Sequence, residues 1–338
     1  MKIVALGRYA VGVCASVVLF SACSSGGSQL APPVGAFAVH PSREQSRVLL
    51  GESKRPSLLY ISNWGTGDVT VYTYLNGSGL LLVGTLTGFS LPAGMCTDNM
   101  GNVWIVDANT RRLYEYAHGG TKPIETIQPH SGYPYSCSVD PTTGNLAVAS
   151  SHPNGKYQAY SVVDVYPKGS KTGKPYSTPH GFKVVDFVAY DGASNLYADA
   201  TPCFRDNCYY DKNGPPGLYE LSNGGTQFGR LTLRGATLYQ PAAINWVSPT
   251  LLLGDRNFQN TGTSGAYKVF VSGAKATVVG TLQFNGTGQT YGFSRRAGRV
   301  VVPDFTGNIV RIYNLADGSV FSTLTTEISS PFSAVVSQ

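Results

Sequence analysis

Charged side chains are scarce in this sequence: Asp, Glu, Lys and Arg make up only 13% of its 338 residues. A helical protein of this length would carry more Glu, Lys, Ala and Leu, and no amphipathic helical pattern follows the N-terminal segment. The sequence has instead 40 Gly, 20 Pro and 21 Tyr. This composition is typical of short strands that are joined by glycine turns and packed through aromatic rings. We therefore expect an all-β protein.

The sequence also lacks the motifs of several enzyme classes. It contains no GxSxG nucleophile elbow, no phosphate-binding P-loop and no HExxH zinc motif. None of its 5 His stands at ligand spacing from another His or Asp. The formal net charge of +6 is not gathered into a basic stripe. We expect no nucleic-acid partner and no metal site built on histidine.

The first 22 residues predict an export signal. Lys2 and Arg8 precede an apolar stretch, residues 9–20, that is too short to span a bilayer. The end of the segment, Leu19-Phe20-Ser21-Ala22-Cys23, resembles the lipobox of bacterial lipoproteins, in which the cysteine is acylated. The resemblance implies lipidation of Cys23. Because Phe20 replaces the usual aliphatic residue, an ordinary signal-peptidase cut near Cys23 stays open as the alternative.

Residues 23–56 predict a flexible linker, since they contain Pro32-Pro33 and a mixed-charge stretch but no strand periodicity. Ser24 is not the Asp that tends to retain lipoproteins in the inner membrane. The expected location is therefore the cell envelope, at the outer membrane if the cell has one, or the extracellular space. The chain would reach the membrane through its N-terminal lipid only, and residues 57–338 would form the folded domain.

One strand phrase recurs six times in that domain. Its copies occupy residues 58–63, 102–107, 145–149, 195–199, 250–255 and 299–304. Equivalent positions lie 43 to 55 residues apart, which is the interval of one four-stranded propeller blade. The repeat predicts a six-bladed β-propeller.

The two ends of the domain predict how the ring closes. The domain opens on a second-type strand at Leu58 and finishes on a first-type strand, residues 332–336. We expect the last strand to pair with the first and complete blade one, because this pairing removes an exposed sheet edge.

Four cysteines remain in a domain whose export would let disulfides persist. Cys96 and Cys137 have opposite parity on equivalent first strands of adjacent blades, so their side chains can face one another. Cys203 and Cys208 flank four residues of the longest loop. We predict the disulfides Cys96–Cys137 and Cys203–Cys208, with buried free thiols as the alternative.

Acidic or amide side chains recur at two places in the repeat. Asp107, Asp255, Asp304 and Asn63 end second strands, and Asp98, Asp140 and Asp191 precede glycine-containing turns. At such positions Asp and Asn bind nearby backbone amides and close a turn. We interpret these residues as structural and do not expect them to be catalytic.

The loops after second strands and before first strands are the long ones, and the topology places them on one side of the ring. Aromatic rings beside polar loop residues can form a platform for a carbohydrate, peptide or protein. The alternative is that individual rings fill wedges between blades. The candidates are Trp64, Arg111, Tyr133, Tyr135, His152, Phe182, Phe204, Arg205, Tyr209, Tyr210, Tyr239, Arg256, Phe258, Tyr291 and Phe305, with Asp186 and Asn245 as polar candidates at the central channel.

The repeat phrases resemble those of NHL-type propellers, which pair a Pro-containing inner strand with a Gly-Asn-apolar-aromatic-Val-Asp second strand, as in residues 92–107. Residues 113–124, with the phrase LYEYAHGGTKPI, and residues 140–148, with DPTTGNLAV, look similar to a group of uncharacterised bacterial lipoprotein propellers. The likeness covers about residues 57–338. It implies the propeller fold and carries no activity.

Enzymatic six-bladed relatives include the gluconolactonase-type lactonases, which hold a divalent cation in the channel with Glu, Asn and Asp side chains. Only Asp186 and Asn245 approach such positions here. Two ligands scarcely make a calcium site, so we expect no cofactor, with a channel Ca²⁺ as the alternative.

Three functions are therefore considered. The leading hypothesis is a non-enzymatic, lipid-anchored and monomeric propeller that binds an envelope protein, peptide or glycan through its loop-rich face. The second is a metal-dependent hydrolase or lactonase that works in the channel. The third is a purely structural envelope protein.

Overall fold

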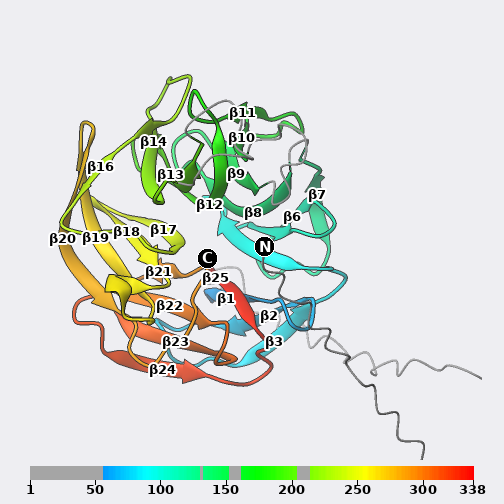
Figure 1. Ribbon diagram of the computed structural model, residues 1–338. Helices are drawn as coiled ribbons and strands as arrows, with labels where there is room; N and C mark the ends of the chain where they lie inside the picture. Colours follow the sequence, from blue (N-terminus) through cyan, green and yellow to red (C-terminus); the bar gives the residue numbers. More distant parts are fainter. Residues whose placement is uncertain (1–55, 130–131, 152–160, 204–213) are drawn as a thin grey trace, which may run out of the picture. The chain divides into compact units, whose positions relative to one another are not determined.

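The computed structural model describes residues 56–129, 132–151, 161–203 and 214–338. Within these ranges the chain forms strands β1 to β25 and a single 3₁₀ turn, η1 (Phe258–Asn260). The strands make six sheets that are arranged as the blades of a ring (Figure 1). The predicted all-β, six-bladed propeller is confirmed.

The first three blades each have four antiparallel strands. From the inner to the outer strand, blade one consists of β25 (Pro331–Ser337), β1 (Leu58–Asn63), β2 (Asp68–Thr73) and β3 (Leu82–Leu86). Blade two consists of β4 (Pro92–Thr97), β5 (Val103–Asp107), β6 (Arg112–Tyr116) and β7 (Pro123–Ile127). Blade three consists of β8 (Tyr133–Val139), β9 (Leu146–Ser151), β10 (Val162–Tyr166) and β11 (Lys174–Tyr176).

The other three blades include one exception to this pattern. Blade four consists of β12 (Phe182–Tyr190), β13 (Leu196–Pro202), β14 (Gly217–Leu221) and β15 (Gly229–Arg230). Blade five consists of β17 (Pro241–Val247), β18 (Thr250–Asp255), β19 (Gly265–Ser272) and β20 (Lys275–Gln283), with β16 (Thr232–Arg234) added outside. Blade six consists of β21 (Ser294–Arg296), β22 (Arg299–Asp304), β23 (Ile309–Asn314) and β24 (Val320–Leu324).

Strand β16 is a fifth strand in blade five, whereas four strands per blade were predicted. It pairs in parallel with the outer strand β20, and Thr232 lies opposite Lys275. The preceding strand β15 is only two residues long, so the chain leaves blade four early and runs along the edge of blade five. This arrangement covers part of an outer edge that would otherwise present unpaired backbone groups.

Second strands are mostly apolar because neighbouring blades cover both of their faces. In β1 every residue is buried. Tyr60 packs in a cluster with Val103 and Ile105 of blade two, whereas Leu59 and its alternate neighbours pack against blade six. Since successive side chains of a strand point to opposite faces, the core of this protein lies between the blades.

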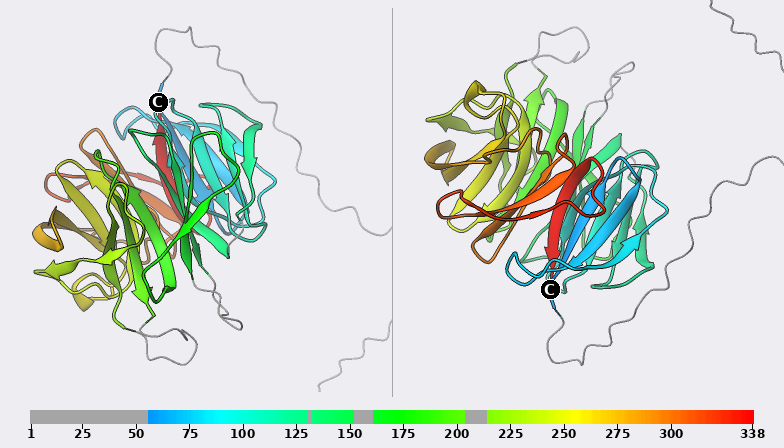
Figure 2. Two further views of the ribbon diagram at one scale, coloured as in Figure 1. Left: turned by 90° about the horizontal axis from the view of Figure 1, so that it is seen from above. Right: turned by 90° about the horizontal axis from the view of Figure 1, so that it is seen from below.

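The ring closes as predicted. Strand β25 pairs antiparallel with β1, and Leu59, Tyr60 and Ile61 lie opposite Val336, Val335 and Ala334. The two ends of the domain, red and blue in Figures 1 and 2, thus lie side by side in one sheet. Backbone pairing between residues distant in sequence therefore holds the ring shut.

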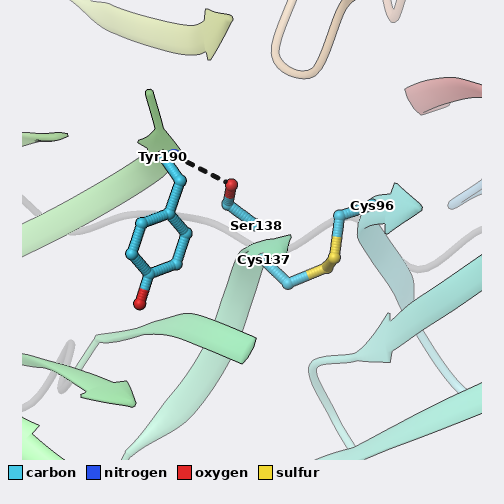
Figure 3. The surroundings of a disulfide bond; sticks show 4 residues. All are labelled: Cys96, Cys137, Ser138 and Tyr190. Atoms are coloured by element: carbon cyan, nitrogen blue, oxygen red, sulfur yellow. Dashed lines mark hydrogen bonds between the residues drawn. A yellow bond between two sulfur atoms is a disulfide. The ribbon is translucent and has the colours of Figure 1, made fainter. Parts of the chain in front are cut away.

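The predicted disulfide between Cys96 and Cys137 is confirmed, with a Cα–Cα distance of 5.6 Å. It joins the inner strands β4 and β8, so it links blade two to blade three (Figure 3). The next residue, Ser138, accepts a hydrogen bond of 3.0 Å from the backbone N–H of Tyr190 in blade four. Three consecutive inner strands are connected at this level of the channel.

The ring has two faces, which we name by their connections. At one face first strands begin and second strands end, as in the pair Pro92 and Asp107. At the other face short turns join first to second strands, as between Thr97 and Val103. We call these the loop-rich face and the tight-turn face.

Candidate functional site

Six aromatic rings gather at the channel on the loop-rich face, and we call them the aromatic cluster. Its members are Trp64, Tyr135, Phe187, Tyr291, Phe305 and Phe332. Phe332 is fully buried at the centre, with ring-centroid distances of 4.8 Å to Trp64, 4.8 Å to Tyr291 and 5.0 Å to Tyr135. Most of the contacts are edge-to-face, an arrangement that aromatic pairs favour.

The aromatic cluster spans the channel. Phe332 belongs to blade one and Phe187 to blade four, on opposite sides of the ring, yet their centroids are 6.4 Å apart. Because rings from opposite blades touch, apolar side chains plug the channel at this end. Below the plug, the inner strands leave a cavity of about 210 Å³ that Phe187 and Asn245 both line.

Four of the predicted face residues, Trp64, Tyr135, Tyr291 and Phe305, are brought together in the aromatic cluster. Sequence reasoning missed Phe187 and Phe332. Phe332 is the second residue of β25 and Tyr135 the third residue of β8, whereas Phe187 is the sixth residue of the longer strand β12. An alignment of first strands could have found Phe332, because Phe332 and Tyr135 both occupy the bulge of their strand; the bulge of β12 is at Asp186, next to Phe187.

Two arginines of the loop-rich face stack on tyrosines. The Arg256 guanidinium lies 4.5 Å from the Tyr291 ring centroid, and its Nε donates a hydrogen bond of 2.9 Å to the carbonyl oxygen of Pro241. The Arg111 guanidinium lies 4.2 Å from the Tyr133 ring centroid. Cation–π contacts hold both cations at the surface in fixed positions. Tyr133 itself is 36% exposed and Tyr239 is 42% exposed.

Two carboxyl groups lie close to the aromatic cluster. Asp199 is fully buried; its Oδ1 accepts a hydrogen bond of 2.7 Å from the N–H of Phe187, while its Oδ2 has no partner in the described part of the chain. Burial, together with the nearby Asp186 charge, raises the pKa of Asp199 well above its usual range. Burial raises the pKa of Asp186 to about 6, and Arg256 opposes that shift. Burial also raises the pKa of Tyr135, and the charge of Asp186 adds to the shift.

The recurring acids at the ends of second strands are structural, as interpreted. Asp107 accepts hydrogen bonds of 2.9 Å from the backbone N–H groups of Ser90 and Leu91. Asp255 binds Tyr239 and Gln240 in the same way. These amides immediately precede the first strand of the same blade. Each acid therefore ties the end of a second strand to the loop that leads into its blade.

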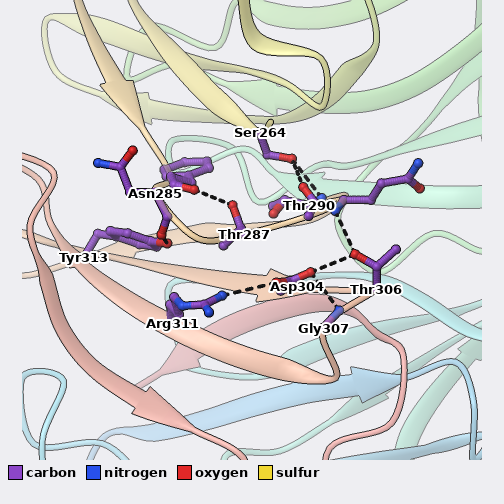
Figure 4. Close-up of polar contacts among 12 residues, drawn as sticks. Ser264, Asn285, Thr287, Thr290, Asp304, Thr306, Gly307, Arg311 and Tyr313 are labelled. Atoms are coloured by element: carbon purple, nitrogen blue, oxygen red, sulfur yellow. Dashed lines mark hydrogen bonds and ion pairs between the residues drawn. The ribbon is translucent and has the colours of Figure 1, made fainter. Parts of the chain in front are cut away.

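Asp304 binds differently from its counterparts (Figure 4). It accepts from the Gly307 N–H at 2.9 Å and forms an ion pair of 3.2 Å with Arg311. Thr306 bridges it to the neighbouring loop, because the Thr306 hydroxyl donates to Asp304 and accepts from the N–H of Gln289. Both Asp304 oxygens thus have partners in Thr306, Gly307 and Arg311, so this carboxylate is not free to bind a ligand.

Asp186 and Asn245, the two channel candidates, do not share a site. The Asn245 amide donates 2.8 Å to the carbonyl oxygen of Phe293 and lines the cavity below the plug. Asp186 is not among the residues that line that cavity. Among the described residues no group of three or more His, Cys, Asp or Glu side chains could hold a metal ion.

Two residues predicted for the loop-rich face belong to the core instead. Phe182 packs on Tyr219 and Phe228 with ring-centroid distances of 5.2 and 5.5 Å, and Phe258 packs 4.8 Å from Tyr267. Both side chains are buried. These two rings pack in the core and do not present their faces on the loop-rich surface.

Several predictions fall outside the described residues. Cys203 is disulfide-bonded, but its predicted partner Cys208 lies outside these residues. The same holds for Cys23 with the export signal and linker, and for His152, Phe204, Arg205, Tyr209 and Tyr210. Across the part of the chain that is described, no helix is long and apolar enough to cross a membrane.

Sequence reasoning also missed two cavities between blades on the tight-turn face. One, of about 280 Å³, lies between blades two and three, and the other, of about 410 Å³, lies between blades four and five. Their rims include Asp98 and Asp191, which do close turns: Asp98 Oδ1 accepts from the N–H groups of Met100 and Asn102. The sequence pattern identifies these acids as turn residues and carries no signal for the cavities beside them.

No family model matches this chain. It is similar to peptidyl-glycine alpha-amidating monooxygenase A of Xenopus laevis, with 27% identity over 107 residues that cover 28% of this chain and 11% of that protein. The chain thus spans about a tenth of the length of this curated relative. It is also similar to a chain in the crystal structure of a nidogen/laminin complex, with 14% identity, a TM-score of 0.62, and coverage of 83% of this chain and 98% of that one. At this identity the likeness shows the fold alone, and the chain is a six-bladed β-propeller.

Proposed function

We propose that the propeller is an interaction module that binds a protein, peptide or glycan through its loop-rich face. The observation that carries the proposal is the aromatic cluster: rings of four blades plug the channel, and Arg256 stacks on Tyr291 beside them. The plugged mouth presents the partly exposed rings of Trp64, Tyr135, Tyr291 and Phe305 in place of a deep reaction chamber. Aromatic and Arg side chains supply much of the binding energy of protein interfaces.

The exposed residues around the aromatic cluster support the same proposal. Tyr133, with Arg111 stacked on it, and Tyr239 present rings to solvent on this face. A ring held by a cation–π contact loses little conformational entropy when a partner binds. The binding surface would therefore be largely preformed.

We further propose that the chain is an exported, monomeric NHL-type propeller of the bacterial lipoprotein group, anchored through Cys23. The lipobox-like segment and the blade phrases of residues 113–124 support this proposal. Residues 23–56 would tether the module to an envelope membrane, where its partner would be found. The metal-dependent hydrolase gains no comparable support, because its two channel candidates do not share a site.

The test compares two faces of the purified domain in capture from envelope extract. The face variant is Tyr133→Ser with Tyr239→Ser. The control variant is Phe270→Ser with Phe321→Ser, which removes rings of similar exposure, 44% and 41%, from the outer strands β19 of blade five and β24 of blade six. We expect the face variant to lose at least about fivefold of the captured partner while the control keeps it.

The class of partner is assigned by mass spectrometry of the captured protein, by a peptide library and by a glycan array. Equal capture by both variants would contradict the proposal. Metal analysis of the same preparation addresses the alternative function, since one calcium held tightly per chain would favour the hydrolase.

A further inference from the structure

The cavity between blades two and three is built by two facing rows of side chains. On blade two, the register places Trp104, Glu115 and Glu125 side by side across β5, β6 and β7. On blade three, it places Val139, Leu146 and Tyr166 side by side across β8, β9 and β10. All six residues line the cavity of about 280 Å³. The cavity is thus a product of strand register and lies on the face opposite the aromatic cluster.

The blade-two wall carries two carboxyl groups that oppose each other. Glu115 and Glu125 are direct cross-strand partners, a position in which like charges destabilise a sheet. Burial raises the pKa of Glu115, and the charges of Asp98 and Glu125 raise it further, while a hydrogen bond from Asn102 opposes the shift. Neither glutamate is ion-paired with a residue in the described part of the chain. The blade-two wall therefore carries two glutamates without an ion-pair partner, and Lys168 lines the same cavity.

The blade-three wall includes the buried side chain of Tyr166. Tyr166 is 1% exposed, and its hydroxyl has no hydrogen-bond partner among the described residues. A buried hydroxyl that gives up water without gaining a partner is costly and is rare in folded proteins.

The chemistry of the walls selects an organic cation rather than a metal ion. The Asp98 oxygens are already occupied by the N–H groups of Met100 and Asn102 and by the Asn102 amide. Within the described ranges the acids here do not converge into a metal-binding group. Trp104 and Leu146, by contrast, offer apolar surface beside the glutamates. An alkyl chain that ends in an ammonium group satisfies both parts of the wall.

We propose that this cavity binds a primary alkylammonium group, with Glu115 and Glu125 as acceptors for its N–H groups and Trp104 and Leu146 packed against its alkyl chain. The source is either a free aliphatic amine or the side chain of a lysine on a partner. The Cys96–Cys137 disulfide joins the same two blades and holds the walls at a fixed separation. Lys168 lines the rim and opposes a second cation there.

The cavity between blades four and five provides an internal control. It repeats the same elements, with Tyr197 in place of Trp104 and Glu220 in place of Glu115. There, however, the residue opposite Glu220 is Gly229, and Glu220 accepts a hydrogen bond of 3.0 Å from Ser222. This second cavity lacks the opposed carboxyl pair, so we expect it not to bind the ammonium group.

The test is isothermal titration of the full mature chain with diaminopentane, butylamine, Nα-acetyl-lysine amide and calcium chloride as separate probes. We expect saturable binding of the amines that weakens with salt. Glu115→Gln and Glu125→Gln should each weaken it at least about tenfold, because each removes a charge-assisted hydrogen bond. Lys168→Met should tighten it, and Glu220→Gln should leave it unchanged.

The probes distinguish a lysine side chain from a free amine as the ligand, and the variants show whether the proposed cavity is the binding site. Tighter binding of the lysine amide than of diaminopentane assigns a lysine side chain, and the reverse assigns a free amine. No saturable amine binding to the wild type, binding of calcium alone, or an equal effect of Glu220→Gln would overturn the proposal. Unchanged melting temperatures for the Gln variants exclude unfolding as the cause. Neither arm depends on the loop-rich face.

Discussion

The two faces of the ring use their polar and aromatic side chains differently. On the loop-rich face, rings pack on one another around Phe332, and the acids Asp107 and Asp255 are filled by backbone amides. On the tight-turn face, Glu125 and the Tyr166 hydroxyl keep no such partners in the described structure. The difference teaches that acids next to turns are filled by backbone amides, whereas Glu125, which lies between outer strands, has no such donor beside it.

The largest expected effect tests whether the ring depends on its loop-rich closure. Removing residues 332–338 deletes Phe332 and most of the pairing between β25 and β1. We expect the domain to unfold, because the truncation opens the ring and exposes a sheet edge. Circular dichroism melting measures it. A cooperative transition at the wild-type temperature would show that closure does not hold the ring.

The second-largest loss of stability is expected for a single substitution in the aromatic cluster. Phe332→Ala removes the ring that touches four others and leaves a cavity, so we expect a loss of about 3–5 kcal/mol in the free energy of unfolding. Met100→Ala on the tight-turn face, where Met100 is 67% exposed, should cost less than about 0.5 kcal/mol. Urea titration of both variants measures the contrast. Similar losses would erase the distinction between the faces.

Much of the fold could be predicted from sequence because its rules are local. The blade interval, the two-residue period of strands and the parity of Cys96 and Cys137 are properties of short segments. Strand β16 was not predicted. Strands β17, β18 and β19 separate it in the sequence from its partner β20, and the pairing is parallel, unlike that of the repeat. No repeat phrase signals such an edge contact.

The sites were less predictable because they depend on packing between blades. Trp64 and Tyr291 were correctly placed on one face, but their contacts run through Phe332 at the far end of the chain. The pair Glu115 and Glu125 depends on the register of β6 and β7, which shifts by a bulge beside Glu115. A sequence pattern does not determine such a shift.

Removal of the disulfide by substitution tests whether the loop-rich face and the tight-turn face are independent. The Cys96–Cys137 link closes a loop of 41 residues, so we expect Cys96→Ser with Cys137→Ser to lower stability by about 2–4 kcal/mol. The loss should increase hydrogen exchange in blades two and three beside the tight-turn cavity, with little change around Tyr291 in the aromatic cluster. Mass spectrometry of hydrogen exchange measures this. Equal loosening of both regions would show that the faces are coupled.

The smallest expected effect concerns a buried carboxylate oxygen without a partner in the described structure, Asp199 Oδ2. Asp199 and Asp186 have pKa values raised by burial, that of Asp186 to about 6. The folded state therefore holds these protons more tightly than the unfolded state, and the pair opposes folding increasingly as pH rises above about 4. Asp199→Asn removes one of the two charges that oppose each other in this pair. We expect a gain of about 1–2 kcal/mol near pH 8 that vanishes near pH 4, measured by urea titration.

The matched control for Asp199→Asn is Asp107→Asn. Both Asp107 oxygens accept backbone N–H groups, so placing an amide NH₂ against those donors should cost about 1–3 kcal/mol near pH 8. Opposite signs for two buried acids of one face would show that partners, rather than burial, decide whether a carboxylate stabilises this ring. A loss of stability in Asp199→Asn near pH 8 would mean that Asp199 Oδ2 has a partner in the folded protein, which would contradict the interpretation of this carboxylate as unpaired.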